Sequence, residues 1–410
     1  MALRLLAYSH DTVGLGHLRR TLGICGDLVG WDPALSALIV TGSPVAEGFH
    51  LPDRVDYVKL PSVRKCGNST YESRSLNLGF DELRRMRSSV IRDTTRGFAP
   101  DVLLVDKTPA GLKGELRATL EDLRERGSRT LRILGLREIL DNPAEMRAEY
   151  EREGLWDFIA EHYDAVWVYG ERGIYDTVRE YEFPEAVAAK TAFVGYLPKY
   201  NGLLPREAVA SELALEGRRL VVVTAGGGED GYPLFDHYLA GLEGAPADAG
   251  VLHCLVTGPA MPAAQQAALR ERAARPDVYF TNFSDHMTSL FAAADLVVTM
   301  GGYNTVTEIL SLRRRAVVVP RVVPRMEQLI RAQRLASRGL VRMIHPAELT
   351  PGHLFGVVSE ELSGGDSPIT STLEFRGHQG VRQELARLLK LREPDGVRDT
   401  HTVDGARASA

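Results

Sequence analysis

A histidine in a glycine-containing loop is the leading candidate for chemistry in the first half of the chain. Gly14 and Gly16 precede His17 in a segment that follows a short apolar run and leads into a helical pattern. Glycines permit a close backbone approach, and a neutral imidazole can accept a proton near pH 7. His17 is therefore a candidate general base, with helix capping or packing as the alternative. Arg19 stands where a dinucleotide-binding fingerprint has its third glycine, so the loop is not that fingerprint.

Two other residues could act together with His17. Asp106 ends the apolar run 102–106 and would lie at the same sheet edge, where its carboxylate could orient the imidazole. The alternative is an ordinary aspartate at a strand end. His10 is near enough in sequence to be an alternate base. The sequence has no Asp-x-Asp pattern and no His/Glu group with metal-ligand spacing, so we expect neither a metal ion nor a cofactor.

Three consecutive glycines make a second loop of interest. Gly226, Gly227 and Gly228 directly follow the apolar run 220–223. The backbone N–H groups of such a loop can hold a diphosphate. No Lys-Ser or Lys-Thr pair follows at Walker A spacing, so the loop is of another kind. We predict a diphosphate site here, and a flexible turn is the alternative.

A third group of residues lies between positions 283 and 328. The apolar run 296–299 leads through Gly302 into a helical pattern. Asn304 or Thr305 could cap this helix, whose positive end would face a phosphate. Glu308 follows Thr305 at the spacing of a capping box, which gives it a structural alternative to ligand binding.

Short apolar runs alternate with amphipathic helical patterns, as is typical of parallel sheets with helices on both faces. In the first half, strands are expected at 3–8, 37–41, 55–60, 102–106, 131–136 and 165–169, and helices at 80–98, 112–126 and 143–162. In the second half, strands are expected at 220–223, 252–257, 278–281, 296–299, 316–319 and 340–344, and helices at 263–274 and 326–337.

The expected fold class is α/β, with two doubly wound, Rossmann-like domains facing each other across a cleft. The Gly- and Pro-containing segment 195–205 would join them. The predicted domains are 1–198 and 206–375. A helix over 376–391 could pack back on the first domain, and 392–410 would be a disordered tail. Ligands of such sheets bind at the carboxyl ends of the strands, which places the expected site in the cleft. The polar segment 65–77 is long for a loop and could form part of a binding site.

The charge balance limits the classes of partner. Lys and Arg number 49 against 54 Asp and Glu, a net charge of −5 that argues against nucleic-acid binding. Three cysteines without a CxxC pair fit a reducing cytoplasm. The arginines of segment 80–98 could contact the inner face of a membrane, and a solvated helix face is the alternative. No protein partner is evident.

The segment 283–328 resembles the nucleotide-sugar-binding half of family 28 (MurG-like) glycosyltransferases, and the loop of Gly16 and His17 resembles that family's amino-terminal motif. The resemblance implies the GT-B fold, with a UDP-sugar, expected to be UDP-GlcNAc, as co-substrate held mainly by the second domain. Residues 206–375 would then be the donor domain and 1–198 the acceptor domain, in which the segment 65–77 could form part of the acceptor site. It implies that Glu308 binds the ribose, that Thr305 and Gln328 contact the donor sugar, that Phe283 and Ser284 lie beside the uracil, that Gly226, Gly227 and Gly228 hold the diphosphate, and that His17 is the base.

The chain departs from that family at two places. Gly228 stands where the family often has Ser, and Arg331 and Ala332 follow Gln328 where the family has Asn-Ala. Neither change removes backbone binding of phosphate, but both leave the identity of the donor sugar open.

The resemblance implies an inverting glycosyltransferase, in which His17 deprotonates an acceptor hydroxyl that attacks the anomeric carbon opposite the diphosphate. The residues from Gly14 to Arg20 also resemble the Gly-x-Gly-His-x-x-Arg loop of the UDP-sugar hydrolase of pseudaminic acid synthesis, so a hydrolase is an alternative. A non-catalytic nucleotide-sugar-binding protein is a third. The acceptor, whether a glycan, a lipid-linked molecule or a small molecule, is not identified by the sequence.

Overall fold

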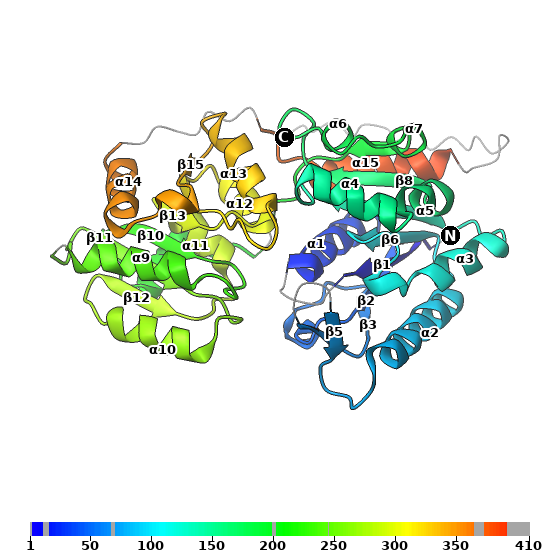
Figure 1. The fold of residues 1–410 in the computed structure, drawn as a ribbon, viewed down its shortest axis with the longest axis horizontal. Helices are drawn as coiled ribbons and strands as arrows, with labels where there is room; N and C mark the ends of the chain where they lie inside the picture. The colour runs from blue at the N-terminus through cyan, green and yellow to red at the C-terminus, as the bar shows by residue number, and fades with distance from the viewer. Residues whose placement is uncertain are drawn as a thin grey trace, which may run out of the picture.

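The structure, a computed structural model, describes residues 2–10, 16–66, 70–198, 202–244, 246–364 and 373–391. The chain forms two lobes, which Figure 1 shows side by side. Gly14 and the predicted tail 392–410 lie outside the described residues.

The first lobe is built on a seven-stranded parallel sheet in the order β3-β2-β1-β6-β7-β8-β9. Its elements are β1 (Arg4–Ser9), α1 (Gly16–Trp31), β2 (Ser36–Thr41), η1 (Ala46–Gly48), β3 (Val55–Lys59), β4 (Val63–Cys66), β5 (Thr70–Ser73), α2 (Phe80–Phe98), β6 (Val102–Asp106), η2 (Leu112–Gly114), α3 (Arg117–Glu125), β7 (Leu131–Arg137), α4 (Pro143–Arg152), α5 (Leu155–His162), β8 (Ala165–Tyr169), α6 (Thr177–Glu180), α7 (Glu185–Ala188) and β9 (Thr191–Phe193).

The second lobe is built on a six-stranded parallel sheet in the order β12-β11-β10-β13-β14-β15. Its elements are α8 (Arg206–Glu212), β10 (Arg219–Thr224), α9 (Tyr232–Glu243), β11 (Val251–Val256), α10 (Ala263–Arg272), β12 (Val278–Thr281), α11 (Met287–Ala293), β13 (Leu296–Thr299), α12 (Tyr303–Ser311), β14 (Ala316–Val318), α13 (Glu327–Ala336), β15 (Arg342–Met343), η3 (Pro346–Glu348) and α14 (Pro351–Ser363). The last helix, α15 (Gly377–Lys390), lies against α1 of the first lobe, where Arg382 Nε donates to Asp27 Oδ2 at 2.8 Å.

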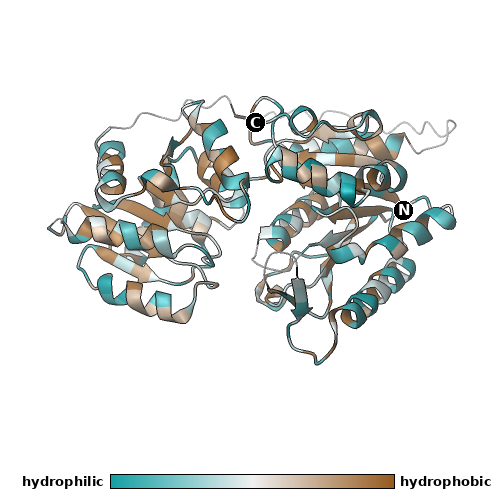
Figure 2. Ribbon diagram, in the orientation of Figure 1, coloured by the Kyte–Doolittle hydropathy of each residue, from teal (hydrophilic) through white to brown (hydrophobic). Residues whose placement is uncertain are grey.

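The strands are apolar because both faces of each sheet are covered. Every residue of β6 and β8 is buried, and most strands of the two large sheets are brown, the hydrophobic colour, in Figure 2. One face of the first sheet packs on α2, α3 and α5, while one face of the second packs on α9, α10 and α14. The remaining faces belong to one continuous apolar cluster, which runs from α1 through Tyr196 to α12.

Both sheets have a topological switch point. In the first sheet the chain leaves β1 for β2 on one side and later returns to β6 on the other side. In the second sheet β10 is flanked in the same way by β11 and β13. A crevice opens where neighbouring connections diverge, and ligands bind there in open α/β sheets. The fold thus offers two crevices, one per lobe.

Three local predictions are wrong. The expected helix 143–162 is two helices, because Gly154 adopts φ 61° between α4 and α5. The expected helix 112–126 begins with the short η2, and α3 starts only at Arg117. The polar segment 65–77 is not a plain loop, since β4 and β5 pair antiparallel within it.

Candidate functional site

The start of α1 places His17 against Asp106 in the first crevice. Nδ1 of His17 lies 2.5 Å from Oδ2 of Asp106, the last residue of β6. Arg20, one turn further along α1, donates from Nε and Nη2 to Oδ1 of Asp106 at 3.0 and 2.6 Å. Because β1 and β6 are neighbours in the sheet, their carboxyl ends bring these three side chains together.

The environment of His17 keeps the imidazole neutral. Burial lowers the pKa of His17 to about 4, although the Asp106 carboxylate acts in the opposite direction. The guanidinium of Arg20 and its hydrogen bonds hold the pKa of Asp106 well below its usual range despite burial. Two groups lie near Nδ1 of His17: Oδ2 of Asp106, which can only accept, at 2.5 Å, and Nη2 of Arg20, which can only donate, at 2.9 Å. Because the carboxylate oxygen is nearer, we assign the proton of His17 to Nδ1, which leaves Nε2 as the acceptor. This is the protonation state that a general base requires.

His10 lies beside this pair without joining it. Its ring is 5.7 Å from the ring of His17 in an edge-on arrangement. Its Nδ1 is buried and has no hydrogen-bond partner among the described residues. Burial holds the pKa of His10 well below its ordinary value. His10 therefore lacks the orienting carboxylate that His17 has.

The glycine loop after β10 is shaped by two left-handed glycines. Gly226 has φ 70° and Gly228 has φ 94°. A Cβ atom on Gly228 would lie 2.3 Å from the carbonyl oxygen of Thr257. No side chain fits there without a backbone shift, which explains why this chain has Gly228 where family 28 often has Ser. Gly227 is open, since a Cβ atom added to it would have no atom within 4 Å.

The helix after β13 begins earlier than the sequence suggested. Gly302 is the N-cap of α12, which starts at Tyr303, so neither Asn304 nor Thr305 caps it. The capping-box interpretation of Glu308 is also wrong, because Thr305 already lies inside the helix. The free N–H groups of the first turn leave a positive helix end at Gly302 and Tyr303.

The site residues of the second lobe converge near this helix end. Thr305 Oγ1 is 3.9 Å from the position that a Cβ atom on Gly226 would take. Glu308 is only 7% exposed, and its Oε2 accepts a 2.7 Å hydrogen bond from Thr288 Oγ1. Phe283 is 47% exposed, as a ring that stacks on a planar ligand must be.

Two residues that were predicted to bind the sugar donor, Ser284 and Gln328, make hydrogen bonds to nearby backbone groups. Ser284 Oγ accepts from the backbone N–H of His286 at 3.3 Å. Gln328 Oε1 accepts from the backbone N–H of Arg321 at 3.0 Å, which leaves its amide N–H groups for a ligand.

One cleft of about 1140 Å³ between the lobes unites these residues. It is lined by Gly16 and His17 from the first lobe and by Gly226, Gly227, Gly228, Phe283, Ser284, Gly302, Asn304, Thr305, Glu308 and Gln328 from the second. Asp106 is 3% exposed and lies behind His17, outside the lining. All the described site residues that were predicted from the sequence line this cleft, except Asp106. Asp106 does not line it but contacts His17, which does.

The sequence analysis did not predict the ion pair that joins the two lobes. Arg331 of α13 donates to Glu138 Oε1 at 2.7 Å, and both side chains are at most 3% exposed. Arg331 is the residue that replaces the family's Asn, so this departure serves the contact between lobes. Arg20 was missed as well, although its spacing of three residues from His17 on a helix was a usable signal.

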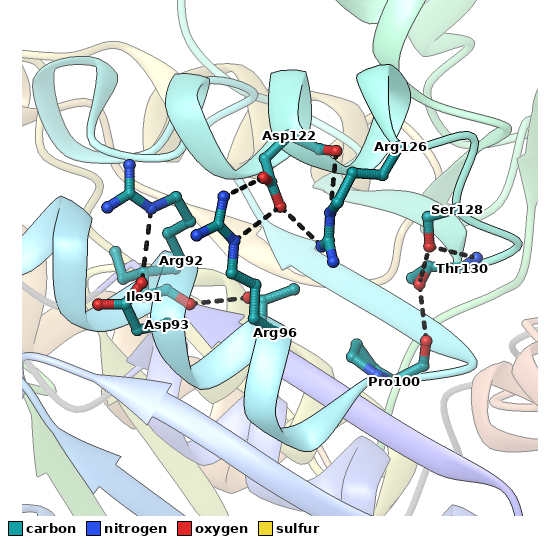
Figure 3. A network of polar contacts seen from close by, with 10 residues as sticks. Ile91, Arg92, Asp93, Arg96, Pro100, Asp122, Arg126, Ser128 and Thr130 are labelled. Atoms are coloured by element: carbon teal, nitrogen blue, oxygen red, sulfur yellow. Dashed lines mark hydrogen bonds and ion pairs between the residues drawn. The ribbon is translucent and has the colours of Figure 1, made fainter.

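The arginines of α2 do not form a free basic face. Arg87 is buried in an ion pair with Glu115 at 2.6 Å, so it belongs to the core. Arg96 pairs with Asp122 of α3, which also binds Arg126 at 2.6 Å, and Figure 3 shows this network. Most of the positive charge that could have met a membrane is thus neutralised locally.

No helix in the described part of the chain is both long and apolar enough to cross a membrane. Within the same ranges, no three His, Cys, Asp or Glu side chains gather as metal ligands would.

Comparisons with known proteins place the second half of the chain in a family. Residues 246–384 match the glycosyltransferase family 28 C-terminal domain. An uncharacterized glycosyltransferase of Methanopyrus kandleri is 25% identical over 44% of this chain and 50% of its own length. The UDP-N-acetylglucosamine–N-acetylmuramyl-(pentapeptide) pyrophosphoryl-undecaprenol N-acetylglucosamine transferase of Pasteurella multocida is 34% identical over 20% of this chain and 23% of its own length. The matches thus span half or less of these relatives.

Solved structures share the whole architecture. MurG of Acinetobacter baumannii superposes with a TM-score of 0.58 at 14% identity, over 94% of this chain and 99% of that one. Phytolacca americana UGT2, solved with UDP-2-fluoro-glucose and pterostilbene, gives a TM-score of 0.63 at 13% identity, over 95% and 100%. At such identities the likeness establishes the fold. The expected GT-B fold is confirmed, and residues 246–384 match the glycosyltransferase family 28 C-terminal domain.

Proposed function

We propose that the protein is an inverting glycosyltransferase that moves a sugar from a UDP-sugar, with UDP-GlcNAc as the first donor to test, to an acceptor hydroxyl. One observation carries the proposal. The His17–Asp106 pair of the first lobe faces the same cleft as the glycine loop and the start of α12 in the second lobe. A base and an anion site on opposite walls of one cleft are what direct displacement at an anomeric carbon needs.

The second lobe would hold the donor. The N–H groups around Gly226 to Gly228 and the positive end of α12 suit a diphosphate. The buried carboxylate of Glu308 suits the ribose hydroxyls, and the exposed ring of Phe283 suits the uracil. The second-lobe match to the family 28 domain supports this assignment.

The first lobe would supply the base. Nε2 of His17 takes the proton of the acceptor hydroxyl, whose oxygen attacks the anomeric carbon. The bond from that carbon to the diphosphate oxygen breaks, and UDP leaves with the electron pair. Asp106 stabilises the imidazolium that forms, and the N–H groups of the donor loops stabilise the charge on UDP. Attack opposite the leaving group inverts the configuration.

A hydrolase that uses the same residues is the second candidate. Arg20 completes the Gly-x-Gly-His-x-x-Arg pattern, and it holds Asp106 in place behind His17. The same pair could activate a water molecule in place of an acceptor hydroxyl. The carbon–oxygen bond that breaks would be the same.

The experiment is a panel of nucleotide sugars incubated with the protein, with and without candidate acceptors, while UDP release is followed. Release only with an acceptor supports the transferase, and release without one supports the hydrolase. UDP binding without any release would favour a non-catalytic binding protein. A parallel set with EDTA tests the proposal that transfer needs no metal ion, and His17→Ala is the control for catalysis by this site.

A further inference from the structure

Two cations line the first-lobe wall of the cleft beside the proposed base. Lys107 directly follows Asp106, and Arg137 ends β7, the next strand of the sheet. The backbone N–H of Lys107 donates to the carbonyl oxygen of Gly135 at 2.8 Å, which fixes the ends of β6 and β7 side by side. Both Lys107 and Arg137 are lining residues of the cleft.

The acidic side chains around them each pair with another arginine, although one carboxylate oxygen of Glu138 and one of Glu327 have no hydrogen-bond partner among the described residues. These ion pairs are Asp106 with Arg20, Glu138 with Arg331, Asp141 with Arg325 and Glu327 with Arg321. In the described ranges, neither Lys107 nor Arg137 forms an ion pair or a side-chain hydrogen bond, and Nε of Arg137 is buried without a partner. The wall therefore carries more positive than negative charge at this point.

The surplus charge is costly without a ligand. Burial and repulsion from Arg137 and Arg325 lower the pKa of Lys107 to about 7, although Glu327 and Asp106 act in the opposite direction. Burial and the nearby Arg331 lower the pKa of Arg137 to about 10, although Glu327 acts in the opposite direction. An anion between the two side chains would relieve the repulsion and satisfy their N–H groups.

We propose that Lys107 and Arg137 form a subsite for an anionic group, phosphate or carboxylate, carried by the acceptor. The assignment to the acceptor rests on the proposed function. It follows from position, because the two side chains come from the first lobe, next to the base, whereas the diphosphate is assigned to the glycine loop and α12 of the second. Leu140, Met146 and Tyr150 line the neighbouring wall, so the acceptor would have an apolar part beside its anionic group.

The test is binding of inorganic phosphate, with acetate as the carboxylate probe, to the full chain saturated with UDP. A titration followed by calorimetry or by phosphorus NMR measures the affinity. We expect phosphate or acetate to bind alongside UDP, and the tighter of the two gives the class of the anionic group. Lys107→Met and Arg137→Gln should each weaken this binding about 10-fold or more while UDP affinity stays unchanged.

Two further variants sharpen the result. Lys113→Met removes the same charge from the same wall and should leave the affinity within about twofold. Arg137→Lys keeps the charge and should retain most of the binding, which tests the subsite even if Arg137→Gln folds poorly.

Three outcomes would overturn the proposal: neither anion binds to the UDP-loaded protein, UDP displaces the anion, or Lys113→Met is as harmful as Lys107→Met. Displacement by UDP would mean that the two cations hold the donor. If UDP itself fails to bind, the proposed function is contradicted, and the same titration on the free protein still decides whether Lys107 and Arg137 hold an anion.

Discussion

Asn304 of the second lobe donates a 3.0 Å hydrogen bond from Nδ2 to the backbone carbonyl oxygen of Gly16 in the first lobe. Gly16 directly precedes His17, and Asn304 lies in the first turn of α12. The bond therefore ties the start of α1, which carries the proposed base, to the helix end assigned to the diphosphate. A direct displacement depends on the distance between these two parts, so we expect the contact to affect turnover more than nucleotide affinity.

A methyl group at Gly16 should disturb this contact. A Cβ atom there would lie 3.2 Å from Asn304 Nδ2, so the amide must move by a few tenths of an ångström. We expect Gly16→Ala to lower kcat about 10-fold, because the base and the donor lose their alignment, with UDP affinity unchanged. Gly30→Ala is the matched control in the same helix, since its Cβ would meet nothing within 4 Å. Equal kcat values for the two variants would contradict the alignment argument.

Removal of the His17 imidazole should lower turnover without weakening UDP binding. We expect His17→Ala to reduce turnover about 10²- to 10⁴-fold, the range for loss of a general base, with UDP affinity nearly intact. His10→Ala is the control, because His10 has no orienting carboxylate and only packs edge-on against His17. Steady-state rates and UDP titrations on both variants measure the effect. A severe loss in His10→Ala together with a mild one in His17→Ala would make His10 the base.

Much of the fold was accessible from sequence because strands buried on both faces are continuously apolar. The run 102–106 was predicted with the bounds of β6, and the helical pattern 80–98 with those of α2. The pattern was misleading where one glycine decides the backbone. Gly154 interrupts an otherwise helical stretch, because its left-handed conformation separates α4 from α5.

The candidate site was predictable only as separate loops. Glycine loops and strand ends indicate where ligands bind, and the parallel-sheet rule brings His17 and Asp106 to one edge. Contacts between lobes leave no such local pattern. The Glu138–Arg331 pair joins residues 193 positions apart, and Asn304 reaches Gly16 over 288 positions. No periodicity within either half encodes these distances.

The pH profile should report a histidine that stays neutral far below its ordinary pKa. Because burial lowers the pKa of His17 to about 4, the imidazole is unprotonated and active throughout the neutral range. We expect the acid limb of kcat/KM to fall near pH 4 and not near pH 6.5. The stability that comes from a neutral His17 is fully present above about pH 6.5 and is lost as the pH falls towards 4. Circular dichroism at each pH therefore serves as the control, and a limb near pH 6.5 in folded protein would contradict the assignment.

The role of the Glu308 carboxylate can be tested by changing the ribose hydroxyls that it is proposed to bind. Loss of a hydrogen bond to a charged group costs about 1.5–3 kcal/mol, so Glu308→Ala should weaken UDP binding by about 10- to 100-fold. UDP lacking the ribose 2′- or 3′-hydroxyl should bind more weakly to the wild-type protein but lose little further affinity in Glu308→Ala. Thr288→Val, which removes only the hydroxyl that donates to Glu308, should have a smaller effect. If the deoxy nucleotides lose equal affinity in both proteins, Glu308 does not contact the ribose.

The glycine loop allows a matched pair of substitutions one residue apart. Gly228 has φ 94°, and its Cβ would lie 2.3 Å from Thr257 O, so Gly228→Ala forces either the loop or segment 257–258 to shift. Strain of this kind costs on the order of 1–3 kcal/mol, which lowers Tm by several degrees, and the displaced N–H groups no longer suit a diphosphate. Gly227→Ala adds the same methyl group where nothing lies within 4 Å and φ is not in the left-handed region. We therefore expect Gly228→Ala to lose both Tm and UDP affinity, while Gly227→Ala keeps its Tm. Its UDP affinity then tells whether the diphosphate approaches the loop on that open side, because a ligand packed against Gly227 leaves no room for the methyl group.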